Sequence, residues 1–358
     1  MERMVNSTLL GLELGKLQSF ENLAVFPALF PKNGGPEYIT LKEALERGVF
    51  SVTEVSAGGS VPDLKVENRG DVAVLLLDGE ELAGAKQNRI LNTTIFVAPK
   101  SSIKVPVSCT EHGRWSYDSR EFRESGHMMA ANLRRVNVGA VNRSLDASRE
   151  FRSDQGRVWN EVAMLHEDLR VSSPTGAMKA VFDAKQADLD AYLKHFPAVD
   201  GQKGMLVFIG GAVAGLDFIS REQAYGVLHA KLVKSYAMEA IVAGLRERPQ
   251  PPERRGIFGR PKRSAAERPE SGSKPEPPAP NEAAARDFLK SAAACDEKAY
   301  ESVGEGWSYR YTGKDVVGSA LAVESTVVHA AFFSIAVSES EKAGSMADLG
   351  SRRRFRTI

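Results

Sequence analysis

Apolar residues recur along the chain in two periods, and the change between them divides the sequence into a β-rich part and a helical part. From about residue 20 to residue 117, short apolar runs of strand length are separated by turn signals. Many of their residues are β-branched or aromatic, which favours strands. This part predicts an antiparallel sheet or a β-sandwich, with strands at residues 50–55, 72–77, 90–97 and 103–109.

Three local signals refine the β-rich part. Thr40 and Glu43 have the spacing of a capping box, which predicts a short helix that ends near Gly48. Asp78 and Gly79 follow the apolar run 72–77 and predict a β-hairpin that continues into residues 80–82. The apolar run 23–30 contains Pro27, and because proline has no N–H, we expect an edge strand there.

After residue 150 the apolar residues recur with a period of 3.6, which is typical of amphipathic helices. A buried strand at 205–209 interrupts this pattern, and an alanine-rich helix is expected at 282–299, before two strand-like halves at 316–334. The helical faces are Val158, Trp159, Val162, Leu165 and Leu169, then Ala177, Val181, Leu189, Tyr192 and Leu193, and then Val227, Leu228, Leu232, Tyr236, Ala240 and Ile241.

These patterns predict an α+β protein in which an antiparallel β-rich, sandwich-like N-terminal half packs against C-terminal helices. We expect one domain from residues 1–246 and 282–336, β-rich over 20–117 and helical over 150–245, with the helix and strands of 282–336 returning to it. Proline, arginine and glutamate dominate residues 247–281, which predicts a disordered linker or loop, and residues 337–358 predict a flexible tail.

Charge and cysteine content narrow the classes of protein. The 358 residues include 47 basic and 46 acidic side chains, so no global charge attracts nucleic acid or a membrane surface. No apolar run is long enough for a transmembrane helix, and no secretory leader is evident. Cys109 and Cys295 lack metal-ligand spacing, and the six histidines form no zinc motif. We expect a cytoplasmic protein without a zinc site and assign no metal-binding residues; the cofactor is unknown, and metal dependence and homo-oligomerisation stay open.

Polar side chains with useful chemistry gather between residues 75 and 117. Asp78, Glu80 and Glu81 could supply a general base or hold a cation, although a solvated turn explains them as well, and strand alternation sends Glu80 and Glu81 to opposite faces. Next come two cations and two amides, which suit phosphate, ribose or a base edge, or else form an exposed bend. These four residues are Lys86, Gln87, Asn88 and Arg89.

A second group of polar residues follows the run 103–109. Cys109 and His112 could form a nucleophile pair, but a cysteine in an apolar strand is more often an inert core residue. Glu111 and Arg114 are better ligand candidates, with Trp115 as a wall for a flat ring. Further along, Gln155 and Trp159 share one face at the start of a predicted helix, where free N–H groups favour anions. A helix cap and a core tryptophan are the simpler explanation of these two residues.

Residues 15–245 and 300–333 resemble the prokaryotic ARG and rhodanese-phosphatase-superfamily-associated protein domain family. Four phrases carry the resemblance: LLLDGEELAGAKQNRILNTTI, PVSCTEHGRWSY, SDQGRVWNEV and GMLVFIGGAVAGLDFIS. The family's name records an association with ADP-ribosylglycohydrolases and rhodanese-phosphatases, which implies a link to ADP-ribose, NAD-derived or phosphorylated nucleotide metabolism. His112 stands where the family phrase has glutamine. The residues that match the phrases are Asp78, Glu80, Lys86, Gln87, Asn88, Arg89, Cys109, Glu111, Arg114, Trp115, Gln155 and Trp159.

The resulting hypothesis is a polar pocket for a nucleotide-like or ADP-ribose-like small molecule. Whether the protein is an enzyme stays open; a hydrolase would use Glu80 or Glu111 as general base. The ligand-binding candidates are Asp78, Lys86, Gln87, Asn88, Arg89, Arg114, Trp115, Gln155 and Trp159. The alternative is a non-catalytic module that recruits a partner enzyme, in which the same residues form a buried structural network.

Overall fold

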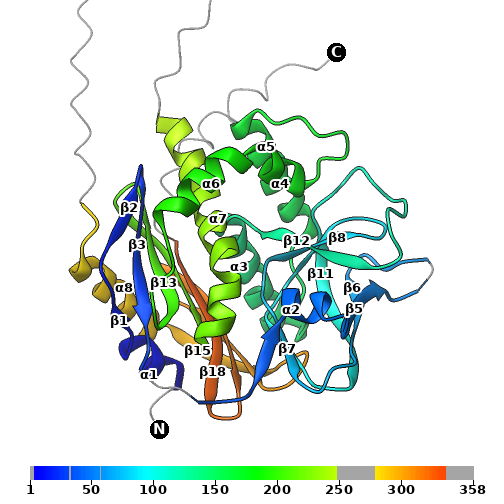
Figure 1. Ribbon diagram of the computed structural model, residues 1–358, viewed down its shortest axis with the longest axis horizontal. Helices are drawn as coiled ribbons and strands as arrows, with labels where there is room; N and C mark the ends of the chain where they lie inside the picture. Colours follow the sequence, from blue (N-terminus) through cyan, green and yellow to red (C-terminus); the bar gives the residue numbers. More distant parts are fainter. Residues whose placement is uncertain (1–3, 32–33, 57, 248–278, 336–358) are drawn as a thin grey trace, which may run out of the picture.

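Two β-rich parts flank a group of helices in the protein, which we describe from a computed structural model (Figure 1). The structure describes residues 4–31, 34–56, 58–247 and 279–335. Nearly all of the predicted linker at 247–281 and the whole predicted tail at 337–358 lie outside these residues. Within the described ranges, no helix has the length and apolar character that a membrane span requires.

The larger β-rich part is a nine-stranded antiparallel sheet in the order β1-β3-β13-β14-β18-β17-β16-β15, with β2 also paired to β3. It joins strands from both ends of the chain, since β3 and β13 are neighbours and β14 pairs with β18. Its strands are β1 (Glu13–Leu14), β2 (Gln18–Phe20), β3 (Leu23–Leu29), β13 (Gln202–Ile209), β14 (Ala212–Ile219), β15 (Asp296–Glu301), β16 (Trp307–Thr312), β17 (Val316–Val323) and β18 (Thr326–Ser334).

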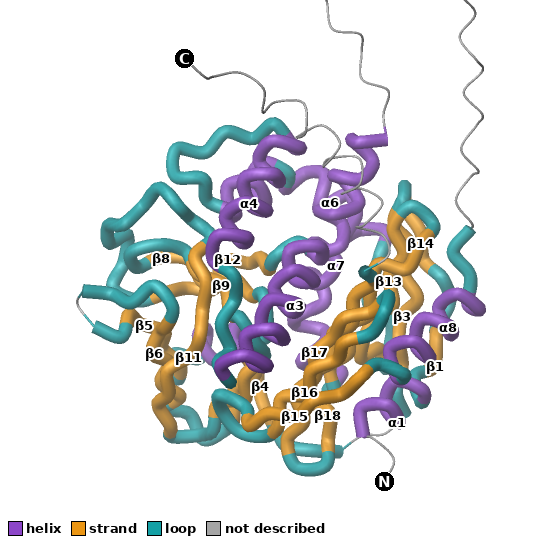
Figure 2. The backbone as a smooth tube through the Cα atoms, turned by 180° about the vertical axis from the view of Figure 1, so that it is seen from behind, coloured by secondary structure: helices purple, strands orange, loops and turns teal. Residues whose placement is uncertain are grey.

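Side chains of this sheet alternate between two apolar cores, one on each face. Leu23 and Val25 point toward the central helices, whereas Ala24 and Phe26 point toward the helices on the other face. Figure 2 shows α3 and α7 on the first side of the sheet and α1 and α8 on the second. The helices are α1 (Met4–Leu10), α3 (Ala131–Ser148), α4 (Gln155–Leu169), α5 (Met178–Ala184), α6 (Gln186–His195), α7 (Glu222–Glu247) and α8 (Glu282–Ala293).

The smaller β-rich part, here called the β-module, covers β4 to β12 and lies at the right of Figure 1. A six-stranded sheet, β12-β8-β9-β11-β6-β5, and a three-stranded sheet, β10-β7-β4, enclose a separate apolar core with α2 (Leu41–Glu46). The strands are β4 (Tyr38–Thr40), β5 (Phe50–Glu54), β6 (Asp63–Asn68), β7 (Ala73–Leu76), β8 (Glu80–Gly84), β9 (Arg89–Leu91), β10 (Ile95–Val97), β11 (Ser101–Cys109) and β12 (Phe122–Met128).

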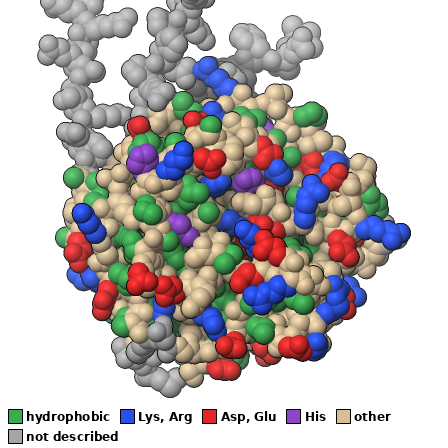
Figure 3. Space-filling model, viewed as in Figure 1, with side chains coloured by type: hydrophobic (Ala, Val, Ile, Leu, Met, Phe, Trp, Pro, Cys, Tyr) green, Lys and Arg blue, Asp and Glu red, His purple; other side chains and the backbone are tan. Residues whose placement is uncertain are grey.

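The α+β class and the β-rich N-terminal half are confirmed. The capping box is confirmed too, because the Thr40 side chain accepts from the Glu43 N–H and the Glu43 carboxylate accepts from the Thr40 N–H. Figure 3 shows acidic and basic side chains interspersed over the visible face, in keeping with a formal charge of +1.

Four expectations were wrong. The run 90–97 does not form one strand, because β9 and β10 divide it and belong to different sheets. The run 72–77 and residues 80–82 do not form a hairpin, because β7 pairs with β4 and β10 while β8 pairs with β9 and β12. β3, which contains Pro27, is not an edge strand, because it pairs with β13 on one side and with β2 and β1 on the other. Pro27 lies between the residues of β3 that pair with β2 and those that pair with β1, so its missing N–H faces the gap between these two strands. The helix expected at 282–299 ends at Ala293, and β15 follows it.

Candidate functional site

Arg89, on β9, places its guanidinium at one end of the β-module's core. In the sheet, Arg89 lies directly opposite Cys109 of β11 on one side and Leu82 of β8 on the other, so all three side chains share one face. Arg89 Nη1 donates to Gln87 Oε1 at 2.8 Å and contacts Cys109 Sγ, whose thiol also donates to Gln87 Oε1 at 3.1 Å. The three polar groups therefore form one closed triangle.

Arg89 makes no ion pair with a carboxylate among the described residues. Its side chain is fully buried, and its Nε and Nη2 atoms have no hydrogen-bond partner. Burying a cation without a compensating negative charge costs free energy of folding, so this arrangement marks Arg89 as a candidate for binding an anion. Burial raises the pKa of the Cys109 thiol, and although the neighbouring Arg89 acts in the opposite direction, the thiol stays neutral as a result.

Aromatic side chains cover this end of the module. The Trp115 ring centroid lies 5.7 Å from Arg89 Cζ, and Lys86 Nζ lies 5.2 Å from the rings of both Trp115 and Tyr117. Trp115 and Tyr117 are 49% and 52% exposed, which is unusual for side chains of this size. A half-exposed indole thus separates a buried cation from solvent.

The start of α4 lies against the end of β11 at this site. The Gln155 side-chain amide accepts from Cys109 N at 2.8 Å and donates to Cys109 O at 3.0 Å, so it pairs with the end of β11 as another strand would. One turn later, Trp159 meets the His112 ring edge to face at 4.4 Å. The buried Trp159 Nε1 donor has no partner in the described part of the chain.

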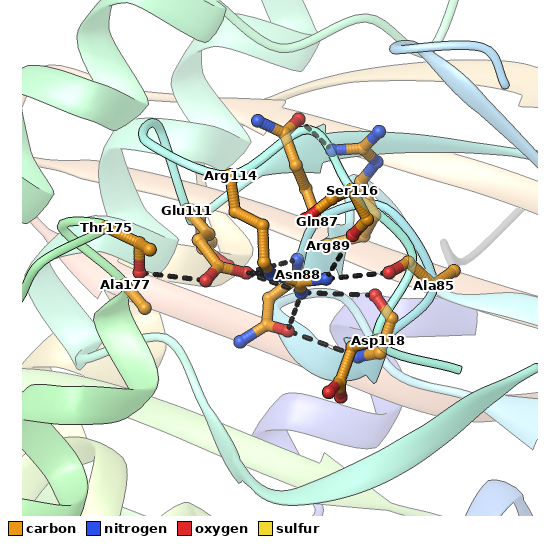
Figure 4. A network of polar contacts seen from close by, with 12 residues as sticks. Ala85, Gln87, Asn88, Arg89, Glu111, Arg114, Ser116, Asp118, Thr175 and Ala177 are labelled. Atoms are coloured by element: carbon orange, nitrogen blue, oxygen red, sulfur yellow. Dashed lines mark hydrogen bonds and ion pairs between the residues drawn. The ribbon is translucent and has the colours of Figure 1, made fainter.

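Arg114 clamps the loop that carries Trp115 (Figure 4). Its Nε and Nη2 donate to Glu111 Oε2 at 2.9 and 2.7 Å. Its Nη1 donates to the carbonyl oxygens of Ala85 at 2.7 Å and Ser116 at 3.0 Å, and Nη2 also reaches Asn88 Oδ1 at 3.2 Å. These contacts use every edge of the guanidinium, so Arg114 positions the loop and has no donor to spare for a ligand.

Glu111 is engaged just as fully. Besides Arg114, Oε2 accepts from Asn88 N at 3.1 Å, and Oε1 accepts from Thr175 Oγ1 at 2.8 Å. Burial raises the pKa of Glu111, but the hydrogen bonds from Arg114, Thr175 and Asn88 outweigh that effect and hold the pKa below its usual value. Glu111 is therefore an anion at neutral pH with both oxygens occupied, which makes it a poor general base.

We expect Arg114→Lys to loosen the loop over residues 110–121, because a single ammonium cannot replace a planar group with five donors. Amide hydrogen exchange in the loop should accelerate about tenfold or more, the effect of losing about one charged hydrogen bond. Arg123→Lys is the matched control, since Arg123 is exposed and makes an ion pair with Asp118 at 3.7 Å. Equal exchange rates in the two variants would show that Arg114 does not hold the loop in place.

Asp78 and Glu80, which the sequence grouped with these residues, belong to other networks. Asp78 lies in a buried cluster with Arg134, Asp217 and His329. Glu80 Oε1 pairs with Lys231 Nζ of α7 at 2.6 Å, and the same ammonium binds Glu124. Sequence reasoning missed Arg134, Asp217, His329 and Lys231, because each comes from a distant helix or strand and follows no local motif.

Glu81 is the group whose protonation the fold changes most clearly near neutral pH. It faces away from Glu80, as strand alternation predicts, and its Oε1 accepts from Thr110 Oγ1 at 2.9 Å. Its Oε2 is buried without a partner, and burial raises the pKa of Glu81 to about 7. The sequence showed Glu81 in an acidic cluster but could not show that only this carboxylate would lack a cation.

Neither of two cavities on the described surface contains Arg89. One, of about 360 Å³, lies beside α1, and the other, of about 460 Å³, lies between α2 and β12. Arg89 is closed over, so a ligand can reach it only if the loop that carries Trp115 moves. Within the described ranges, no group of three or more His, Cys, Asp or Glu side chains could hold a metal ion.

Comparison with known proteins places the chain in a family. The sequence model of the ARG and Rhodanese-Phosphatase-superfamily-associated Protein domain matches residues 11–333. No curated protein and no solved structure matches the chain. Because the match includes the β-module, the central helices and the nine-stranded sheet, the chain belongs to the ARG and Rhodanese-Phosphatase-superfamily-associated Protein domain family.

Proposed function

We propose that the protein binds a small molecule with an anionic group and a flat ring, of the nucleotide or ADP-ribose class, at the end of the β-module. The observation that carries the proposal is Arg89, a fully buried guanidinium that makes no ion pair within the described ranges and lies beneath the half-exposed Trp115. A ligand anion would compensate the charge of Arg89, and a ring could stack on the indole. The family's name records an association with ARG and rhodanese-phosphatase-superfamily proteins, and the nucleotide class is what that association implies.

The proposal is one of binding and does not include hydrolysis. Both oxygens of Glu111 are engaged by Arg114, Asn88 and Thr175. Glu80 accepts from Lys231 through one oxygen and from the Leu77 N–H at 2.8 Å through the other. A general base needs a free oxygen within reach of the proton that it removes, so neither carboxylate supports a reaction at Arg89.

An interaction module is the second candidate, and one specific observation favours it. Trp115 and Tyr117 are large, half-exposed and adjacent, and exposed aromatic side chains are frequent in protein interfaces. A partner protein would cover both rings and leave the clamp of Arg114 in place. Binding of small nucleotides distinguishes the two functions, because a module that recruits a partner has no need for them.

Titration with ADP-ribose, NAD and AMP, followed by calorimetry, tests the proposal. We expect binding to at least one of the three, weakened about tenfold or more in Trp115→Ala, since stacking of a base on an aromatic ring contributes about 1–3 kcal/mol. Trp307→Ala is the matched control, because Trp307 of β16 is also 49% exposed. Absence of binding to all three, or equal loss in both variants, contradicts the proposal.

A further inference from the structure

One edge of the Arg89 guanidinium is engaged and another is free. Nη1 is held by Gln87 Oε1 and Cys109 Sγ, whereas Nε and Nη2 have no partner among the described residues. In a planar guanidinium, Nε–H and one N–H of Nη2 point in the same direction from the same edge. The free donors therefore include the two that together fit a pair of oxygen atoms.

The surroundings hold this edge in one orientation. Gln87 Oε1 accepts from both Arg89 and Cys109, so rotation of the guanidinium would break that triangle. Gln155 in turn fixes the backbone of Cys109 through two hydrogen bonds. Trp115 lies over the guanidinium with its ring centroid 5.7 Å from Cζ, and because the indole N–H is itself a donor, it cannot satisfy the donors of this edge. A donor pair held this way loses little freedom when an acceptor arrives.

We infer that the Nε and Nη2 edge of Arg89 binds two oxygens of one carboxylate or phosphate group side by side. This inference rests on the proposed function for the entry of a ligand into the site. Paired N–H···O bonds to an oxyanion are shorter and stronger than neutral hydrogen bonds, and they reject anions that have a single acceptor atom. The site therefore selects the anion by shape as well as by charge.

One protein carboxylate acts on the site without occupying this edge. Glu54, at the end of β5, raises the pKa of Cys109 through its charge, yet it makes no ion pair with Arg89 in the described structure. Its Oε2 accepts from Ser60 N at 3.5 Å, and its Oε1 is buried without a partner. The oxyanion is thus expected from a ligand, and Glu54→Gln should not weaken its binding.

Inorganic phosphate, acetate and chloride, compared at equal ionic strength on the full chain, test the inference. Binding is followed by the Arg89 Nε–H resonance in ¹⁵N NMR, identified by its loss in Arg89→Lys. We expect phosphate or acetate to shift this resonance and chloride not to shift it. Arg89→Lys keeps the charge but not the paired donors, so phosphate should bind about tenfold or more weakly. Whichever of phosphate and acetate binds more tightly identifies the group.

Three outcomes separate this inference from the proposed function. If phosphate and acetate act no differently from chloride, or if Arg89→Lys binds them as tightly as the wild type, the inference is overturned. If the oxyanions bind through Arg89 but ADP-ribose, NAD and AMP do not, the inference stands and the nucleotide class is wrong. If Arg89→Lys does not fold, the loss of the resonance in Arg89→Gln identifies it instead, and its shift in the wild-type protein then decides the question.

Discussion

Arg134→Met should lower the free energy of unfolding by about 3–5 kcal/mol, the usual cost of breaking a buried ion pair by removing one partner. Arg134 of α3 is fully buried and binds both oxygens of Asp217 at 2.9 and 2.6 Å, with Asp78 at 3.5 Å. Without it, two buried carboxylates lose their cation. Because Asp217 comes from β14 and Asp78 from the β-module, the cluster ties the two β-rich parts together.

The electrostatics of Asp217 support this expectation. Burial raises the pKa of Asp217, but Arg134, together with His329, overcomes that effect and holds the pKa well below its usual value. Tyr236 of α7 also donates to Asp217 Oδ2 at 2.8 Å. The carboxylate is therefore ionised throughout the physiological range, so its charge must be compensated in the folded protein.

Urea unfolding of Arg134→Met measures the effect directly. Lys290→Met is the control, because Lys290 and Asp287 form an exposed ion pair on α8, and pairs of this kind contribute little. Adding Asp217→Asn to Arg134→Met should recover part of the loss, since it removes one uncompensated charge. If Arg134→Met unfolds at the same urea concentration as Lys290→Met, the buried cluster does not stabilise the fold as described.

Glu81→Gln should stabilise the protein at pH 8 by up to roughly 3 kcal/mol relative to its effect at pH 4.5. Burial raises the pKa of Glu81 from 4.5 to about 7, partly offset by Thr110, Ser125 and the charge of Lys179, while the charge of Glu111 adds to the rise. A raised pKa means that the folded state favours the protonated form. The stability associated with protonated Glu81 is complete below pH 4.5 and is lost as the pH rises through about 7.

Unfolding of Glu81→Gln and of the wild type between pH 4.5 and pH 8 gives this difference. Subtracting one curve from the other removes the contributions of groups common to both, such as His127, whose pKa burial lowers. Glutamine resembles the protonated carboxyl, so the two curves should meet below pH 4.5, diverge as the pH rises from 4.5 to about 7, and stay a constant distance apart above that. A difference that does not change with pH would contradict the raised pKa of Glu81, and Glu121→Gln, a substitution at an exposed carboxylate, is the control.

The sequence was informative where short-range chemistry decides the structure. A capping box needs only residues 40–43, and the polar groups around 86–89 and 109–115 come together because β9 and β11 pair in antiparallel register. Strand pairing over long distances was not predictable: Asp78-Gly79 has the spacing of a hairpin turn, yet the two flanking strands enter different sheets. The helix at Ala131–Ser148 has many polar residues, and its pattern did not predict it.

The roles of the site residues were harder to predict than their positions. Arg89 and Arg114 are both arginines beside amides and carboxylates in the sequence. Only the packed structure shows that Arg114 uses all its donors on the loop, whereas two nitrogens of Arg89, Nε and Nη2, make no hydrogen bond among the described residues. Burial and hydrogen-bond satisfaction depend on residues from several elements, so spacing within one segment could not distinguish a clamp from a ligand-binding cation.

A crystal structure of the protein grown with saturating ADP-ribose tests most directly whether an anionic ligand binds Arg89 beneath Trp115. We predict ligand oxygens within hydrogen-bond distance of Arg89 Nε and Nη2, with a ring of the ligand against Trp115. The account is contradicted if ADP-ribose binds elsewhere, or if the Arg89 edge stays without an oxyanion at a concentration that saturates the protein in solution.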